Sequence, residues 1–152
     1  MSDFERAGEA LATFVKTYVP LANAAALQVD SYDGSTLVLS APLDKNINDK
    51  GTAFGGSLYN LCVTAGWGMT SLKCQELGLT GDIVVAKGEI EYLAPLKSRL
   101  IATILAPTDE QLRHFKDSYT RRGRAAITQS VVIPDERGKP CARFVGRYAI
   151  VK

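Results

Sequence analysis

The sequence is poor in the side chains that bind metal ions. It has one histidine, His114, and three cysteines, Cys62, Cys74 and Cys141, among 152 residues. No two cysteines form a CxxC pair, so the ligand spacing of a zinc site is missing. We therefore expect no metal and no cofactor. An odd number of cysteines also favours a reducing compartment, such as the cytoplasm, over an oxidising one.

Excess charge and long apolar segments are lacking as well. The 18 basic and 16 acidic residues leave a net charge of +2, too small to indicate a nucleic-acid partner. No apolar run approaches the roughly 20 residues of a membrane span, and the acidic start, residues 1–6, contains no apolar signal core. The length fits one domain of about 100–200 residues. We therefore expect a single cytoplasmic domain covering residues 1–152, with no membrane partner.

Hydrophobic periodicity predicts the secondary structure. Ser2 and Glu5 have the spacing of a capping box, which predicts a helix that ends near Tyr18, before Pro20. Thr108 is a suitable N-cap for a second, exposed helix. Alternation of apolar and polar residues predicts six strands. The predicted ranges are 109–122 for the exposed helix and 26–32, 36–41, 82–92, 97–106, 123–133 and 142–151 for the strands.

The segment 54–77 predicts a third helix of a different kind. It is preceded by a polar loop, and no charged residue occurs from Gly51 to Leu72. A helix without a polar face should be buried on all sides. One long antiparallel β-sheet wrapped around this buried central α-helix accounts for the order of elements. The sequence therefore predicts an α+β fold.

Several motifs carry a resemblance to a known family. Asn48-x-x-Gly51-Thr52-x-Phe54-Gly55-Gly56 resembles the N-x-x-G-x-x-H-G-G signature of hotdog thioesterases. With Asn46-Ile47-Asn48, Ala65-Gly66-Trp67-Gly68 and Tyr92-Leu93-Ala94-Pro95, the chain resembles the YiiD C-terminal thioesterase-like family, whose members are similar to malonyl-acyl-carrier-protein decarboxylases. The resemblance implies a hotdog fold and a substrate held as a thioester by coenzyme A or acyl carrier protein. It also implies a homodimer or larger homo-oligomer, with the site between subunits.

Four residues are the catalytic candidates. Gly55 and Gly56 begin the central helix, where free N–H groups and the positive end of the helix dipole suit an oxyanion. Asn46 and Asn48 are neutral donors and acceptors that an extended loop would place on the same side. The alternatives stay open: the glycines serve a steric need at the junction, and the asparagines are turn residues.

The departures from the signature favour one reaction over another. Phe54 replaces the signature histidine, and residues 58–64 contain no acid, so no general base for hydrolysis is evident. Decarboxylation of a malonyl thioester needs only a stabilised enolate oxygen and a dry pocket that weakens solvation of the carboxylate. Malonyl-acyl carrier protein decarboxylation, giving the acetyl thioester that primes fatty-acid synthesis, is the first hypothesis. An acyl thioesterase and a non-catalytic acyl-thioester binding module are the alternatives.

Other residues are candidates for substrate binding. Thr52, Phe54 and Ser57 belong to the motif, and Trp67 lies between two glycines that would allow close packing or leave a tunnel for an acyl chain. The basic residues Arg121, Arg122 and Arg124 form either a solvated face or a contact for coenzyme A phosphates or an acidic carrier protein.

Overall fold

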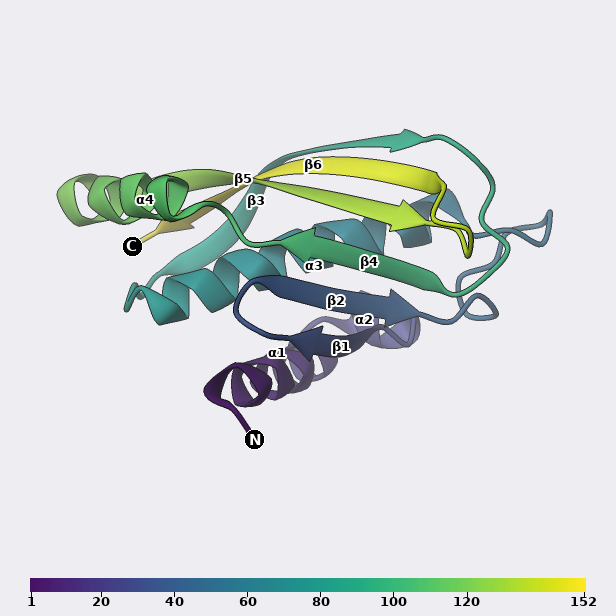
Figure 1. Ribbon diagram of the computed structural model, residues 1–152, viewed down its shortest axis with the longest axis horizontal. Coiled ribbons are helices and arrows are strands. Elements are labelled where there is room, and N and C mark those ends of the chain that lie inside the picture. Colours follow the sequence, from purple (N-terminus) through teal and green to yellow (C-terminus); the bar gives the residue numbers. More distant parts are fainter.

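The computed structural model describes residues 1–152 and has four helices and six strands (Figure 1). The six strands form one antiparallel sheet in the order β1-β2-β4-β5-β6-β3. The bounds are α1 Asp3–Tyr18, α2 Pro20–Ala24, β1 Gln28–Tyr32, β2 Thr36–Ala41, α3 Gly55–Glu76, β3 Asp82–Tyr92, β4 Leu100–Leu105, α4 Asp109–Arg122, β5 Arg124–Pro134 and β6 Pro140–Val151.

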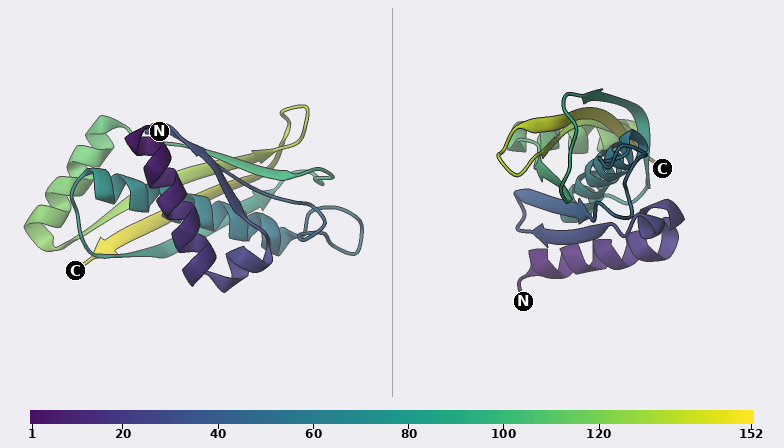
Figure 2. Two further views of the ribbon diagram at one scale, coloured as in Figure 1. Left: turned by 90° about the horizontal axis from the view of Figure 1, so that it is seen from below. Right: turned by 90° about the vertical axis from the view of Figure 1, so that its right-hand side faces the viewer.

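The sheet curls around α3 (Figure 2, right), so the predicted arrangement of an antiparallel sheet wrapped around a central helix is confirmed. Alternate residues of β4, β5 and β6 are buried, as their apolar and polar alternation requires. Most of the buried side chains meet those of α3 in a cluster of 24 residues, and a second cluster of six residues joins the start of β5 and the end of β6 to α4 and Cys74. This is the α+β hotdog architecture.

The glycines inside α3 serve close packing. A methyl group at Gly66 would overlap the ring of Tyr148, whose hydroxyl donates to the Val63 carbonyl at 2.7 Å. A methyl group at Gly68 would come within 3.0 Å of the Leu11 side chain of α1. Gly66 therefore lets the sheet approach α3, and Gly68 lets α1 approach it. Close packing therefore accounts for the two glycines in α3, although glycine weakens a helix.

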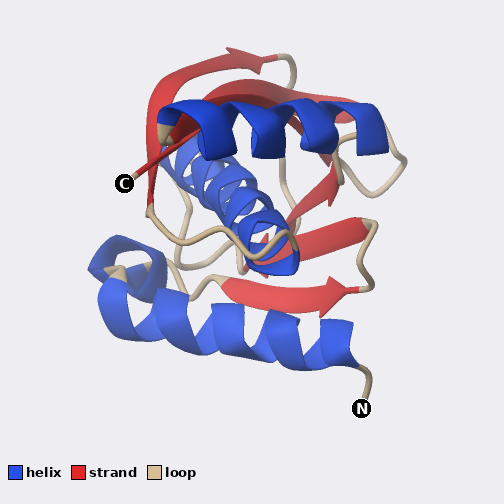
Figure 3. Ribbon diagram, turned by 90° about the vertical axis from the view of Figure 1, so that its left-hand side faces the viewer, coloured by secondary structure: helices blue, strands red, loops and turns tan.

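Two helices flank this core. The N-cap of α1 is Ser2, whose hydroxyl accepts from the Glu5 N–H; this is one of the two bonds of the predicted capping box. The N-cap of α4 is Thr108, which forms a complete capping box with Gln111. In Figure 3, α4 and α1 lie on opposite sides of the end of α3. None of the helices combines the length and apolar composition that crossing a membrane requires.

Several predicted boundaries are wrong. Strand β1 begins at Gln28 rather than residue 26, and β6 begins at Pro140 rather than residue 142. The sequence gives no prediction of α2, which begins at Pro20 because proline is well tolerated in the first turn of a helix. Strand β4 begins at Leu100 rather than residue 97. Residues before it form a connection in which the Leu96 carbonyl accepts from the Ala53 N–H, at 2.8 Å, instead of joining the sheet.

A buried ionic cluster holds the β1–β2 hairpin against the C-terminal part of α3. The Lys73 side chain is only 9% exposed, and its Nζ donates to the Gly34 carbonyl at 2.5 Å and to Glu76 Oε1 at 2.9 Å. The Tyr32 hydroxyl donates to the other oxygen of Glu76. Burial and this hydrogen bond raise the pKa of Tyr32 above its usual value, so the hydroxyl stays protonated. The one acid of α3 is therefore engaged in structure.

Candidate functional site

The loop before α3 is tied closely to the start of that helix. Ile47 and Ala53 form an isolated antiparallel bridge across the loop. The Phe54 N–H donates to the Asn46 carbonyl at 2.8 Å, and the Ala53 N–H donates to the Leu96 carbonyl. These backbone bonds fix the loop, the helix start and the segment after β3 relative to one another.

The first turn of α3 presents free N–H groups. Phe54 is the N-cap, with an extended backbone and no side-chain capping bond, and its carbonyl accepts from Ser57 and Leu58, both at 3.0 Å. The N–H groups of Gly55 and Gly56 donate to no group of the chain. Unpaired donors at the positive end of a helix favour an anion. The prediction that Gly55 and Gly56 begin the helix is confirmed. Their N–H groups are free to donate to an anion.

Asn48 organises its own loop. Its Oδ1 accepts from the backbone N–H of Lys50 at 2.8 Å and of Thr52 at 3.0 Å, and its Nδ2 donates to Thr52 Oγ1 at 2.8 Å. Gly51, with φ of +79°, completes the turn in a conformation that favours glycine. The side chains of Asn48 and Thr52 are thus bonded to each other. Any contact of Asn48 with a substrate has to use its second amide hydrogen.

Asn46 anchors the loop to the rest of the chain. Its side chain is nearly buried, with an exposed fraction of 3%. Its Nδ2 donates to the carbonyls of Ala25 at 3.0 Å and Pro42 at 2.7 Å, which uses both amide hydrogens. The Asn46 side chain therefore has no donor left for a developing negative charge, and only its amide oxygen, Oδ1, is without a partner.

A pocket of about 280 Å³ lies beside the helix start. It brings together Asn46 and three other predicted residues, Phe54, Gly56 and Ser57, with two residues that sequence reasoning missed, Lys45 and Asn60. Phe54 is 55% exposed and forms an apolar wall. Asn60 follows Gly56 by four residues, a spacing that puts both on one helix face and was visible in the sequence. The remaining wall comes from α2 and the residue after it, Leu21, Ala24 and Ala25.

Tyr92 joins the end of β3 to the start of α3. Its hydroxyl donates to the Gly55 carbonyl at 3.0 Å. Loss of hydration raises the pKa of Tyr92 above its usual value, with smaller contributions from Cys62 and Tyr59, so it remains a donor at neutral pH. Tyr92 belongs to the motif that carries the family resemblance, and this contact gives the motif a structural reason.

Trp67 lies about three turns further along α3 than the pocket. Its Nε1 donates to the Ile83 carbonyl at 3.0 Å, and its ring stacks on Phe14 with centroids 5.3 Å apart. It lines a cleft of about 710 Å³ between α1, α3 and β3. Within one chain, Trp67 is therefore not part of the pocket beside the helix start.

The basic residues are at the other end of the molecule. Arg121, Arg122 and Arg124 surround the junction of α4 and β5, all exposed and without a carboxylate partner. In Figure 1 this junction lies at the opposite end from the start of α3. The hydroxyl of Tyr119 donates to the Thr80 carbonyl, which ties α4 to the segment after α3. The full length of α3, roughly 30 Å, separates the cluster from the pocket.

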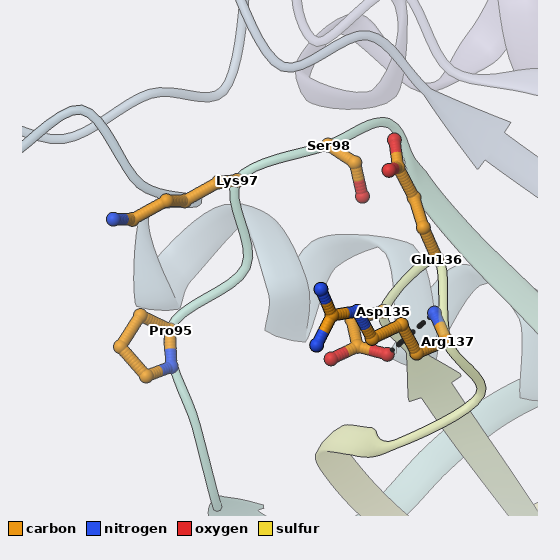
Figure 4. A pocket seen from close by; sticks show the side chains of 6 residues that line it. All are labelled: Pro95, Lys97, Ser98, Asp135, Glu136 and Arg137. Carbon is orange, nitrogen blue, oxygen red and sulfur yellow. Dashed lines mark hydrogen bonds between the residues drawn. The ribbon is translucent and has the colours of Figure 1, made fainter.

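A second hollow near the helix start is polar (Figure 4). It has a volume of about 370 Å³ and lies between the segment after β3 and the β5–β6 turn. The Asp135 carboxylate accepts from the N–H groups of Arg137 and Lys139, both at 2.9 Å, and so shapes the turn. The Lys97 side chain points away from the others. Without an apolar wall, this hollow does not suit an acyl chain. Its lining residues are Pro95, Lys97, Ser98, Asp135, Glu136 and Arg137.

The cysteines take no part in this chemistry. Cys62, Cys74 and Cys141 are all buried and unpaired. Burial raises the pKa of Cys62 to about 12 and that of Cys74 to about 11, so both are neutral thiols at physiological pH and not nucleophiles. His114 is exposed on α4.

Comparison with known proteins agrees with the fold and the motifs. The family model described as "Putative thioesterase (yiiD_Cterm)" matches residues 8–152. A protein of unknown function from Chlorobaculum tepidum TLS is 42% identical, with a TM-score of 0.92 over 95% of this chain and 94% of that one. The "putative thioesterase from Shewanella oneidensis" is 32% identical, with a TM-score of 0.86 over 97% and 99%.

A more distant structure shares the fold alone. The PaaI protein of the E. coli phenylacetic acid degradation operon is 17% identical, with a TM-score of 0.71 over 99% of this chain and 97% of that one. The family model matches nearly the whole sequence, including the loop, the start of α3 and the end of β3. The chain therefore belongs to the YiiD C-terminal family of thioesterase-like proteins, with the hotdog fold.

Proposed function

We propose that this protein decarboxylates a malonyl thioester to the acetyl thioester. The observation that carries the proposal is the composition of the pocket. Its lining contains no aspartate, glutamate or histidine, and α3 has no acid before Glu76, which is bonded to Lys73 and Tyr32. The central helix of a symmetric partner would likewise add no acid before Glu76. Activation of water normally requires such a base.

The groups that are present suit loss of CO2. With the thioester carbonyl oxygen at the N–H groups of Gly55 and Gly56, the bond between the carboxylate and the α-carbon breaks, and its electron pair moves to that oxygen as an enolate. The helix N-terminus stabilises this charge without a titratable group. Water then protonates the α-carbon. The side chains of Phe54 and Leu21, both more than half exposed, provide the apolar part of the wall beside the carboxylate.

Thioester hydrolysis is the second candidate, and the description of the family favours it. One assay separates the candidates: purified protein is incubated with malonyl and with saturated acyl thioesters of coenzyme A and of acyl carrier protein. Decarboxylation gives CO2 and an intact acetyl thioester. Release of free thiol in step with substrate loss, without CO2, would replace the proposal with a thioesterase. Binding without any product would indicate a non-catalytic module.

We propose that the functional unit is a homodimer formed through β3. This strand pairs with β6 on one side only, so its other edge has free backbone donors and acceptors. Val84 and Val85 on it are 47% and 46% exposed. A long edge strand with exposed apolar residues can pair with another chain. Lysine at Val84 or Val85 should give monomers in sedimentation, whereas lysine at Val132, an exposed valine of β5, should not. A compact, active wild-type monomer would contradict the dimer.

The same dimer gives the arginines a function. Antiparallel pairing of two β3 strands reverses the partner, which brings the partner's α4 to the end where this chain's α3 begins. We propose that Arg121, Arg122 and Arg124 then bind phosphates of coenzyme A or the acidic surface of acyl carrier protein. Glutamine at Arg121 and Arg122 should raise KM several-fold with little change in kcat, and the effect should shrink at high salt. Glutamine at Arg113, an exposed arginine of the same helix, is the control.

A further inference from the structure

The pocket beside the start of α3 contains one unpaired cation and one amide with unpaired hydrogens. We propose that Lys45 and Asn60 form a subsite that recognises a terminal carboxylate on a short acyl group. This inference rests on the proposed function, because it assumes that the thioester carbonyl lies at the glycine N–H groups. It adds the residues that decide which acyl group is accepted.

Asn60 supplies a neutral donor. Its Oδ1 is 3.5 Å from the Thr64 hydroxyl, and its Nδ2 donates to no group of the chain. It lies four residues beyond Gly56, about 6 Å along the axis, on the same face. An acyl group whose carbonyl oxygen is at Gly56 therefore extends toward Asn60, where an amide N–H meets an atom about two carbons further on.

Lys45 supplies the charge. It lines the pocket and forms no ion pair, whereas Lys50 in the same loop is bonded to Asp49 at 3.1 Å. Its backbone position is fixed, because the next residue, Asn46, is the buried anchor of the loop. Lys45 is exposed, so a pair with a substrate carboxylate is screened by solvent. Such a pair selects for charge without holding the carboxylate so tightly that its loss as CO2 is prevented.

The remaining groups of the pocket agree with a short, negatively charged occupant. The volume of about 280 Å³ is below the range of about 300–1,000 Å³ of sites for drug-sized ligands. The α2 residues Leu21 and Ala24 form one side of the pocket. No side chain lining the pocket carries a negative charge that would repel a carboxylate.

The test uses two thioether analogues of coenzyme A that have neither a scissile thioester nor CO2 to lose. One ends in a carboxylate and the other, of equal size, in a primary amide. Wild-type protein should bind the carboxylate about tenfold more tightly, as expected for a charge-assisted hydrogen bond with a screened ion pair. Lys45→Met should reduce that preference about fivefold, and Asn60→Asp should abolish or reverse it. Lys50→Met is the control and should keep the wild-type preference.

Equal affinity of the wild type for the two analogues, or an unchanged preference in Lys45→Met, would overturn the inference. Matching circular dichroism spectra and melting temperatures establish that each variant folds. The result is independent of the reaction: a carboxylate preference in a protein that releases no CO2 removes the proposed decarboxylase and keeps the subsite. Decarboxylation without a carboxylate preference would remove the subsite and keep the proposed decarboxylase.

Discussion

Replacing Asn46 with alanine separates a structural from a catalytic role of this residue. The change removes the Nδ2 that donates to the Ala25 and Pro42 carbonyls from a side chain that is 3% exposed. Each lost hydrogen bond costs about 1 kcal/mol, and leaving the carbonyls without a donor adds to this, so the free energy of unfolding should fall by about 2–3 kcal/mol. At about 2–4 °C per kcal/mol for a chain of this size, the melting temperature should fall by about 4–12 °C.

The assay is thermal unfolding followed by circular dichroism, with kcat measured well below the transition. Asn46→Asp is the matched variant, because it keeps the shape but places carboxylate oxygens against the two carbonyls. It should be at least as destabilising as alanine. A wild-type melting temperature for Asn46→Ala, combined with lost turnover, would refute this reasoning. Such a result would return Asn46 to the role first predicted from the sequence, a direct contact with the reacting group.

Three further predictions concern the core. Gly66→Ala should lower stability by about 1–3 kcal/mol in chemical denaturation, because the new methyl group overlaps the Tyr148 ring; an unchanged midpoint would contradict this packing. Glu76→Gln should lower the free energy of unfolding by about 1–3 kcal/mol, because it leaves the buried Lys73 ammonium without a carboxylate partner. Adding Lys73→Met should recover part of that stability. Additive effects of the two changes would show that the pair does not interact. Burial raises the pKa of Cys62 to about 12, whereas the pKa of an exposed thiol is 9.0. The stability that the neutral thiol contributes to the folded state should therefore be fully present below pH 9 and be lost between pH 9 and about pH 12. Cys62→Ala should lessen that decline in urea titrations, and an identical pH dependence in the variant would argue against a buried thiol.

The fold is largely readable from the sequence because burial depends on patterns within short segments. The uncharged stretch from Gly51 to Leu72 can be satisfied only by a helix enclosed on all sides, and α3 is that helix. The alternating segments around it become the strands of the curled sheet. The helix bounds were predicted well where a capping residue such as Ser2 or Thr108 marks them. The start of β4 was not, because its partner strand decides it.

The roles of individual polar residues were decided by contacts between segments distant in the sequence. Asn46 and Asn48 look alike in the motif, yet Asn46 is bonded to Ala25, 21 residues earlier, whereas Asn48 is bonded within its own turn. Asn60 and Lys45 line the same pocket only because the loop lies beside α3, which the sequence pattern does not reveal.

By itself, then, the sequence determined the central buried helix, the antiparallel sheet, the glycine start of α3 and the absence of a base on it, all of which are local properties of residue type and spacing. Only the tertiary structure decided which amide hydrogens remain free, which cation lines the pocket, and that Trp67 and the arginines lie away from it within one chain. The physical reason is that a hydrogen bond or a pocket wall joins residues from two segments that meet in space. The spacing of residues along the chain describes each segment but does not say which segment it meets.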